Sequence, residues 1–346
     1  MPRHDRNAQI STAVSLLRQG KLVSFPTETV YGLGADAANP DAVRRIFALK
    51  GRPANHPLIV HLVAADQLNL WAREIPEAAW GLAERFWPGP LTLILKKAPW
   101  VPPEVTGGQD TIGLRIPAHP LAIDLLQAFG GGLAAPSANR FGRISPTRAA
   151  HVREEFGDRL DLVLDGGGCK VGVESTILSL ATEEPVLLRP GNISGSQLAE
   201  VLGCRPLTGT TSAAGIRAPG VLPSHYAPRT PLTIEPHERL WTRAKQLRKQ
   251  GLRVALMTLE KPPADICPSE QAQVIEMPNR PQSYANRLYH TLRSLDRGSN
   301  DLLLVEIPPQ TEAWTAINNR LLRAAATKQE TGEKTDDREL YKRSTG

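Results

Sequence analysis

Hydrophobic and polar positions along the first sixty residues predict short strands that alternate with helices. Apolar residues recur at helical spacing over residues 8–19, and a short buried strand over 21–25 follows. The strand ends at Pro26, because a proline has no N–H to give to a strand ladder. Asn39 then caps a second helix, which ends at Gly51. The chain therefore begins in the manner of an α/β protein.

Polar residues gather where these elements end. Thr29 follows the first strand, and Lys50 and Arg52 lie on either side of the glycine that ends the second helix. His61 lies in the apolar run PLIVH, which begins at Pro57 and predicts another strand. In open α/β sheets, ligands bind at the edge formed by the carboxyl ends of the strands. Taken singly, Lys50 could equally cap its helix and His61 could be an ordinary core histidine, so the residues alone leave both interpretations open.

The same patterns predict the next two segments. Residues 66–87 are typical of a helix with a break near Pro76, and the chain then returns to a strand in WPGPLTLIL. In a further strand within 111–120, Arg115 faces the opposite way from its apolar neighbours. Such an arginine usually lies on a solvated face, but in a cleft its planar fork suits a carboxylate.

A run of small and polar residues follows over 131–147, where a strand ends at Pro136. Ser137, Asn139 and Ser145 lie there among glycine and proline. All of these are common turn formers, so a plain loop is one interpretation. The other is a nucleotide site, because small side chains and free backbone groups let a phosphate or an adenine approach closely.

The chain then changes character twice. Strands within 162–195 place Ser175 at the head of one and Arg189 at the end of the next. A linker is expected where Gly, Pro, Ser and Thr accumulate, and beyond it helix and strand alternate as in a small Rossmann-like α/β domain. The predicted parts are a first domain over 1–206, a linker over 207–230, a second domain over 231–326 and a charged, disordered tail over 327–346.

Composition fits a globular protein of two domains. The 346 residues are 41% hydrophobic and 22% charged, and no apolar run is long enough to span a bilayer. The N-terminus is charged at once and lacks the apolar core of a secretory signal. The cysteines are far apart and have neither zinc-site nor disulfide spacing, which fits a reducing cytoplasm. The net charge of +6 favours an anionic partner, either nucleotide phosphates or a polynucleotide.

Two glycine-rich stretches look like phosphate motifs but fail in their context. Gly32, Gly34 and Ala37 match a GxGxxA pattern, yet no helix opens there and no acidic residue follows about twenty positions on. The run that ends in Lys170 lacks the GxxxxGK[ST] spacing. A site for ATP would therefore have to be of another kind.

Several segments together resemble one known family. TETVYGLG, KGRP and PLIVH occur in the order and spacing of the YrdC-like family of threonylcarbamoyl-AMP synthases, and WPGPLT, ESTI and LRPG agree as well. SHYAP and the final helix AINNRLLRAA are similar to the family's two-domain long form. The resemblance implies a YrdC-like twisted mixed open sheet with helices, followed by a Rossmann-like domain. The chain departs from the family pattern at two places. Asn55 precedes His56, where the family often has asparagine at position 56, and TEAW replaces a glycine-rich segment before the last helix.

The resemblance also implies a reaction and its residues. Family members condense L-threonine, bicarbonate and ATP, with Mg²⁺, into L-threonylcarbamoyl-AMP and diphosphate, the first step towards N6-threonylcarbamoyladenosine in tRNA. Lys50 and Arg52 would be the catalytic cations, and no protein ligand for a metal is identified. The L-threonine site would consist of Thr29, His61, Arg115 and Ser175. The ATP site would consist of Arg52, His56, Thr111, Ala135, Ser137, Asn139, Ser145, Arg189 and Tyr226, the last as a lid.

The implied partners are the three substrates and a downstream tRNA threonylcarbamoyl-transferase complex, with direct tRNA contact left open and no membrane. A competing hypothesis is a protein that holds RNA on a basic face, with binding that weakens steeply with salt. The cations here are few and interleaved with hydroxyls, which suits a nucleotide better. Another carbamoyl-adenylate chemistry, that of hydrogenase maturation proteins, is a second alternative, but those chains carry zinc-finger and acylphosphatase-like segments.

Overall fold

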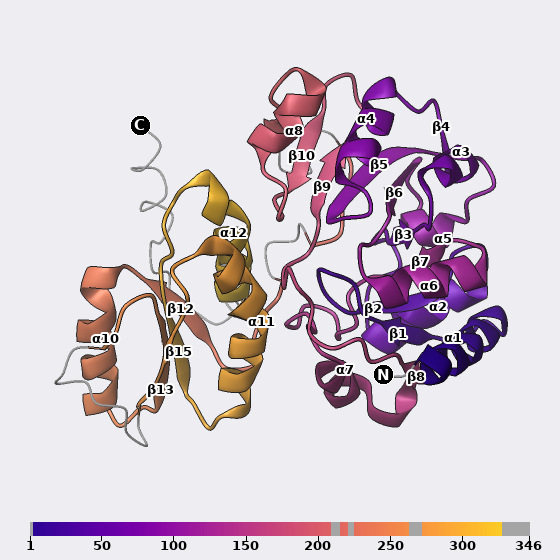
Figure 1. The fold of residues 1–346 in the computed structure, drawn as a ribbon. Coiled ribbons are helices and arrows are strands. Elements are labelled where there is room, and N and C mark those ends of the chain that lie inside the picture. The colour runs from indigo at the N-terminus through magenta and orange to yellow at the C-terminus, as the bar shows by residue number, and fades with distance from the viewer. Residues whose placement is uncertain (1–2, 209–214, 221–224, 263–271, 327–346) are drawn as a thin grey trace.

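The described residues fold into two bodies, each built on its own β-sheet (Figure 1). The structure is a computed structural model that describes residues 3–208, 215–220, 225–262 and 272–326. Cys267, the predicted tail and parts of the predicted linker lie outside these ranges. The predicted domain boundaries therefore stay predictions, whereas the two sheets can be described strand by strand.

The larger body contains a mixed sheet with eleven strands in the described part of the chain. Its order is β11-β10-β9-β5-β6-β3-β7-β2-β1-β8, and β4 pairs with β5 outside this path. Parallel and antiparallel pairs are interleaved, since β3 runs parallel to β6 and antiparallel to β7. The strands are β1 (Val23–Phe25), β2 (Gly32–Asp36), β3 (Ile59–His61), β4 (Ala72–Arg73), β5 (Leu91–Lys97), β6 (Thr111–Arg115), β7 (Leu133–Ala134), β8 (Leu162–Val163), β9 (Thr176–Ser179), β10 (Val186–Arg189) and β11 (Leu207–Thr208).

Helices pack against this sheet, and the best specified of them begins and ends as its sequence predicts. The side chain of Asn39 accepts hydrogen bonds from the first backbone N–H groups of the helix, and Gly51 ends it with a left-handed φ of 62°. The helical segments of this body are α1 (Arg3–Arg18), α2 (Pro40–Lys50), η1 (Ala65–Gln67), α3 (Leu68–Trp71), α4 (Glu77–Phe86), α5 (Pro103–Thr106), α6 (Pro120–Phe129), α7 (Ala149–Phe156), η2 (Gly157–Arg159) and α8 (Gly195–Leu202).

The smaller body is a three-layer α/β unit. Its described strands are all parallel, in the order β12-β15-β13-β14. Alternate residues of β13 divide between the two faces: Val254 and Leu256 pack with α10, whereas Ala255 and Met257 pack with α11 and α12. The elements are β12 (Leu232–Glu235), α10 (His237–Lys249), β13 (Val254–Thr258), β14 (Ala272–Glu276), α11 (Pro281–Arg297), β15 (Leu302–Glu306), η3 (Glu312–Trp314) and α12 (Thr315–Ala325).

Helices α11 and α12 lie between the smaller sheet and the larger body, and α10 lies on the far side (Figure 1). Asn286 on α11 donates from Nδ2 to the carbonyl oxygens of Cys169 and Lys170, at 2.7 and 2.9 Å. Arg293, on the same helix, donates to the carbonyl oxygen of Ile144. The two bodies thus meet through α11 on one side and the loops before α7 and β9 on the other.

The predicted fold class, a mixed open sheet with helices and a smaller Rossmann-like domain, is confirmed. The structure differs from the sequence-based expectations at three places. The helix expected over 66–87 is interrupted by β4, which pairs with β5, and β12 was not predicted. Strand β2 was also missed, because its glycines obscure the strand pattern. Within the described ranges, no helix has the length and apolar character needed to cross a membrane.

Candidate active site

Two of the predicted site residues are brought together by strand pairing. The parallel register of β3 and β6 places His61 opposite Arg115 at the ends of both strands. Each side chain is buried, with 3% and 4% of its surface exposed. Burial, and secondly the charge of Arg115, lowers the pKa of His61 to about 3. His61 is therefore a neutral imidazole, and its Nδ1 has no hydrogen-bond partner in the described structure.

The turn after β1 supplies two partners of Arg115, and the loop before β5 supplies a third. Its Nη1 donates to Oγ1 of Thr29 at 3.0 Å, its Nε donates to the carbonyl oxygen of Gly89 at 3.2 Å, and its Nη2 forms an ion pair with Glu28. Thr27 orders this turn by donating to the carbonyl oxygen of Val30 at 2.6 Å. Because Glu28 neutralises Arg115, the guanidinium can be buried without an unpaired charge.

A second buried arginine is held at the ends of β9 and β10. Arg189 donates from Nε to the carbonyl oxygen of Ser175 and from Nη2 to Oγ of the same residue, at 3.0 and 3.1 Å. The Ser175 hydroxyl is also 2.8 Å from Oγ1 of Thr92. The ESTI and LRPG segments thus form one structural unit, in which the fork of Arg189 fixes the position of Ser175.

The KGRP segment has two different tasks. Lys50 donates from Nζ to the carbonyl oxygens of Ser137 and Asn139. It therefore holds the backbone of residues 137–139, the SxN segment, in place. Burial, followed by the nearby charge of Arg52, holds the pKa of Lys50 well below its usual value. Arg52 donates from Nη2 to the carbonyl oxygen of Pro57 at 2.8 Å, while its buried Nε has no partner in the described structure. Arg52 is thus the one of these two cations that lines the pocket.

The end of the linker closes over these residues. Tyr226 has a positive φ of 65°, unusual for a tyrosine, and its buried hydroxyl makes no hydrogen bond in the described structure. Its neighbour His225 is also buried. Gly220 lies against the Tyr226 side chain, since a Cβ added at Gly220 would come within 2.2 Å of the tyrosine hydroxyl oxygen. A glycine is therefore needed here for the linker to lie over the site.

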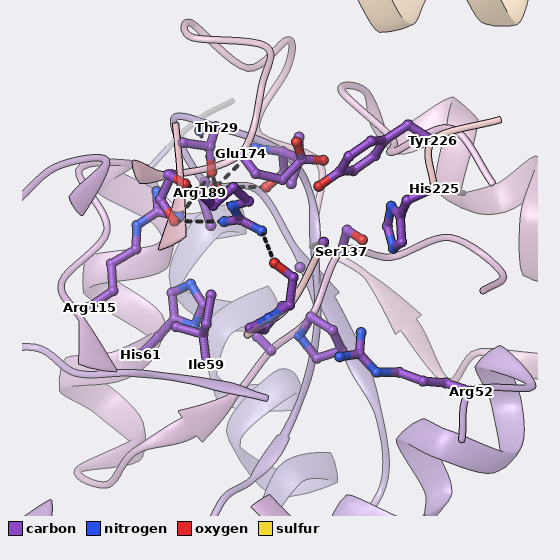
Figure 2. A pocket seen from close by; sticks show the side chains of 18 residues that line it. Thr29, Arg52, Ile59, His61, Arg115, Ser137, Glu174, Arg189, His225 and Tyr226 are labelled. Carbon is purple, nitrogen blue, oxygen red and sulfur yellow. Dashed lines mark hydrogen bonds between the residues drawn. The ribbon is translucent and has the colours of Figure 1, made fainter. Parts of the chain in front are cut away.

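All these segments line one pocket. Figure 2 shows Arg115 and His61 at one side, Arg52, His225 and Tyr226 at the other, and Ser137 between them. The predicted residues that line it are Thr29, Arg52, His61, Arg115, Ala135, Ser137, Ser175, Arg189 and Tyr226. Lining residues that were not predicted include Glu174, Gly220 and His225.

The remaining predicted residues do not line this pocket. His56 lines an adjoining hollow together with Arg52 and Phe141, and its ring meets that of Phe141 edge to face. Ser145 donates to Glu174 at 2.6 Å. Lys50 and Asn139 lie behind Ser137. Thr111 opens β6 and lines none of the described pockets around the site.

Glu174 is a pocket residue that the sequence did not single out. It lies within the ESTI segment, beside the predicted Ser175, at a position before a strand where a glutamate is ordinarily exposed. Burial opposes its ionisation, but Arg320, Arg189 and the bond from Ser145 outweigh burial and bring the pKa of Glu174 to about 2. The pocket therefore carries one fixed anion among its cations.

Buried neutral histidines make the stability of the fold depend on pH. Burial is the first cause that lowers the pKa of His61, His151 and His225 to about 3 each, from 6.5. Below pH 6.5 the unfolded chain binds protons that the folded chain excludes. Stability should thus fall as pH drops from 6.5 towards 3, by about 1.4 kcal/mol per pH unit for each histidine.

Urea titrations of the wild type and of His151→Asn at pH 7 and pH 5 check this expectation. The asparagine can still accept the 3.2 Å hydrogen bond from the backbone N–H of Thr147, but it does not titrate. The variant should therefore lose less stability than the wild type between these two pH values. Equal losses in both proteins would show that His151 is protonated in the folded chain.

Comparisons with known proteins agree with this organisation. The family model described as "Telomere recombination" matches residues 15–191. The model described as "Threonylcarbamoyl-AMP synthase, C-terminal domain" matches residues 193–326. The two matches together span both bodies.

Full-length relatives extend the match. The threonylcarbamoyl-AMP synthase of Pyrococcus abyssi is 40% identical over 326 residues, which covers 92% of this chain and 94% of the relative. That of Bacillus subtilis is 42% identical over 322 residues, covering 92% and 93%. The crystal structure of P. abyssi Sua5 complexed with L-threonine aligns with a TM-score of 0.84 at 39% identity, covering 91% of this chain and 94% of that one.

The relatives make this chain an ATP-using synthase of the nucleotidyltransferase class, and Tyr226 of the linker lines a pocket that also contains three arginines. The chain belongs to the family of two-domain threonylcarbamoyl-AMP synthases.

Proposed function

We propose that this pocket holds L-threonine and ATP together while the carbamate formed with bicarbonate attacks the nucleotide. The enzyme is a threonylcarbamoyl-AMP synthase that serves the t6A modification of tRNA. The observation that carries the assignment of the site is the convergence of Arg52, Arg115 and Arg189, from three separate segments, on one pocket. Three buried cations are a suitable lining for a cavity that must accept several anions at once.

The L-threonine half of the pocket is assigned to Thr29, His61, Arg115 and Ser175. The relative from P. abyssi was solved with L-threonine. In this chain, Arg115 has the planar fork that pairs with a carboxylate, and the hydroxyls of Thr29 and Ser175 can orient the amino acid. Because His61 is neutral, it can accept a hydrogen bond from the amine or the hydroxyl of the substrate without adding charge.

The ATP half is assigned to the part of the pocket lined by Ser137, Arg52 and Arg189. Arg52 and Arg189 are the cations placed for the phosphates, and the unpaired Nε of Arg52 is a donor without a partner in the described structure. Tyr226 covers this half, and its free hydroxyl is a donor for a phosphate oxygen. We assign the supporting positions around the nucleotide to His56, Thr111, Ala135, Asn139 and Ser145, with Lys50 holding the backbone of Ser137 and Asn139.

The chemistry needs charge compensation more than a covalent intermediate. The amine of L-threonine loses a proton and adds to bicarbonate, which releases water and gives a carbamate. A carbamate oxygen then attacks the α-phosphorus of ATP, and the bond to the leaving diphosphate breaks. Two anions must approach each other for this step, and Arg52 and Arg189 would offset their repulsion in a pocket where it is little screened. Catalysis would therefore consist of positioning and electrostatics.

Mg²⁺ fits this scheme as part of the substrate MgATP. Among the described residues, no cluster of three or more acidic, histidine or cysteine side chains could hold a metal, and Glu174 is already paired. Mg²⁺ commonly binds through substrate phosphates and water when a protein offers few carboxylates. The downstream tRNA threonylcarbamoyl-transferase complex, a direct tRNA contact and the cytoplasmic location stay predictions.

Product analysis tests the proposed function. The full chain is incubated with MgATP, L-threonine and ¹³C-bicarbonate, and the adenylate is examined by mass spectrometry. We expect an AMP adduct of threonine that carries a single ¹³C atom. A threonine adenylate without the label would mean that the amino acid carboxylate, rather than a carbamate, attacks the nucleotide.

A further inference from the structure

The smaller body reaches the pocket with a fully buried cation. Arg320 lies on α12, and only 1% of its surface is exposed. Among the described residues it is the largest side chain buried to this degree. A buried arginine needs partners for its donors and for its charge. All of its partners outside α12 belong to the segments that build the pocket.

The guanidinium of Arg320 joins the two strand ends that carry predicted site residues. Its Nε donates to Oε2 of Glu174 at 2.7 Å, and its Nη2 donates to the carbonyl oxygen of the same residue at 3.3 Å. Its Nη1 donates to the carbonyl oxygen of Pro190 at 2.9 Å. Glu174 immediately precedes Ser175, and Pro190 immediately follows Arg189. One side chain of the second body thereby fixes both residues in place.

Arg320 also neutralises the one carboxylate that lines the pocket. Glu174 accepts further hydrogen bonds from the hydroxyls of Ser145 and Tyr289, at 2.6 and 2.9 Å, so it is held as an anion. Without Arg320, the nearest compensating cation in the pocket would be Arg189, which also bonds to Ser175. An arginine drawn to a neighbouring carboxylate is less available to a phosphate, and the carboxylate would itself repel the nucleotide.

The same arginine supports the residue that covers the site. Its guanidinium carbon lies 5.3 Å from the centre of the Tyr226 ring, a cation–π distance. The ring of Tyr289, from the same body as Arg320, also stacks on the ring of Tyr226, with the two ring centres 5.8 Å apart. The second body therefore contributes to the charge balance of the pocket and to the position of its cover.

We propose that Arg320 is a positioning residue for adenylate formation: it neutralises Glu174, and so leaves the charge of Arg189 available to the phosphates of ATP. This gives the second domain a direct part in the reaction. The inference rests on the proposed function, because it assumes that Arg189 binds ATP. Arg320 itself does not line the pocket and is not expected to touch the substrate.

Four variants of the full chain test the proposal, with diphosphate release measured at varied ATP concentration. Arg320→Met keeps an unbranched side chain under Tyr226 but leaves Glu174 unpaired, and we expect its KM for ATP to rise by at least about tenfold. Glu174→Gln/Arg320→Met removes both charges. Its KM for ATP should therefore be about tenfold lower than that of Arg320→Met and close to that of Glu174→Gln alone. Arg297→Gln removes an exposed ion pair with Glu154 between the two bodies and should change nothing.

Recovery in the double variant distinguishes charge compensation from packing. Thermal unfolding of each variant shows which of them are folded. If Arg320→Met does not fold, Glu174→Gln and the double variant still decide, because their KM values for ATP should then agree within about threefold. An unchanged KM in a folded Arg320→Met, or a double variant with an ATP requirement far above that of Glu174→Gln, would overturn the proposal. A wild type that releases no diphosphate would refute the proposed function instead.

Discussion

Replacing Arg52 by alanine should abolish ATP-dependent turnover while the chain stays folded. The side chain lines the pocket, its Nε has no partner in the described structure, and one bond ties it to the carbonyl oxygen of Pro57. Burial lowers the pKa of Arg52 to about 10, so the side chain is still a cation at neutral pH. Removing one preorganised donor from a site of developing charge costs about 10²- to 10³-fold in kcat. Because Arg52 has no carboxylate partner here, its loss leaves no anion unpaired.

The measurement is diphosphate release by Arg52→Ala beside thermal unfolding of the same preparation. Arg44→Ala is a matched control on the preceding helix, since Arg44 is an exposed arginine that pairs with Asp41 and Glu104. Exposed pairs of this kind contribute little, so the control should keep full activity. Turnover by Arg52→Ala at the wild-type rate would remove Arg52 from the phosphate site.

Replacing Arg115 by alanine should have two separable effects. The requirement for L-threonine should rise strongly, because the fork assigned to its carboxylate is gone, and a charge-assisted hydrogen bond is worth about 1.5–3 kcal/mol. Stability should fall as well, by about 3–5 kcal/mol, because Glu28 is left buried without its cation. Activity measured at varied L-threonine and unfolding in urea report the two effects independently.

A double variant separates the two roles of Arg115. Glu28→Gln/Arg115→Met removes both charges, so it should regain stability while the KM for L-threonine stays high. An unchanged dependence on L-threonine in either variant would show that another residue holds the carboxylate. A stable Arg115→Ala would show that Glu28 is protonated or otherwise paired in the folded chain.

Sequence reasoning located the pocket because most of its chemistry lies at strand ends within short contiguous motifs. Pro26 ends β1, and Thr29 follows it; the glycine after Lys50 ends α2 and turns Arg52 back towards the sheet. Local rules for turns and caps suffice for such positions. Pairing of β3 with β6 then brings His61 beside Arg115, which the shared edge of an open sheet made a reasonable expectation.

What escaped sequence reasoning depends on contacts between distant segments. Glu174 is neutralised in the pocket by Arg320, which lies 146 positions away in the second body. Local patterns cannot show that pairing. Strand β2 was missed for a related reason: Gly34 is a glycine because a Cβ there would lie 2.7 Å from the ring of Phe25 on β1. A glycine chosen by tertiary packing looks, in the sequence alone, like a turn or a phosphate loop.

Lys50 lies near the predicted site, but its side chain does not line the pocket. It was predicted as a catalytic cation together with Arg52, since both belong to one motif. In the structure its Nζ donates to two carbonyl oxygens of the SxN segment and does not line the pocket. Sequence spacing placed the residue at the site, but only the packing of α2 beneath Ser137 shows which way the side chain points.

Release of diphosphate by the purified full-length protein tests the central claim most directly. MgATP is supplied with L-threonine and bicarbonate together, with each alone, and with neither. The account predicts release that requires both L-threonine and bicarbonate and is absent when either is omitted. Release that is independent of L-threonine, or no release alongside salt-sensitive binding of RNA, would contradict it.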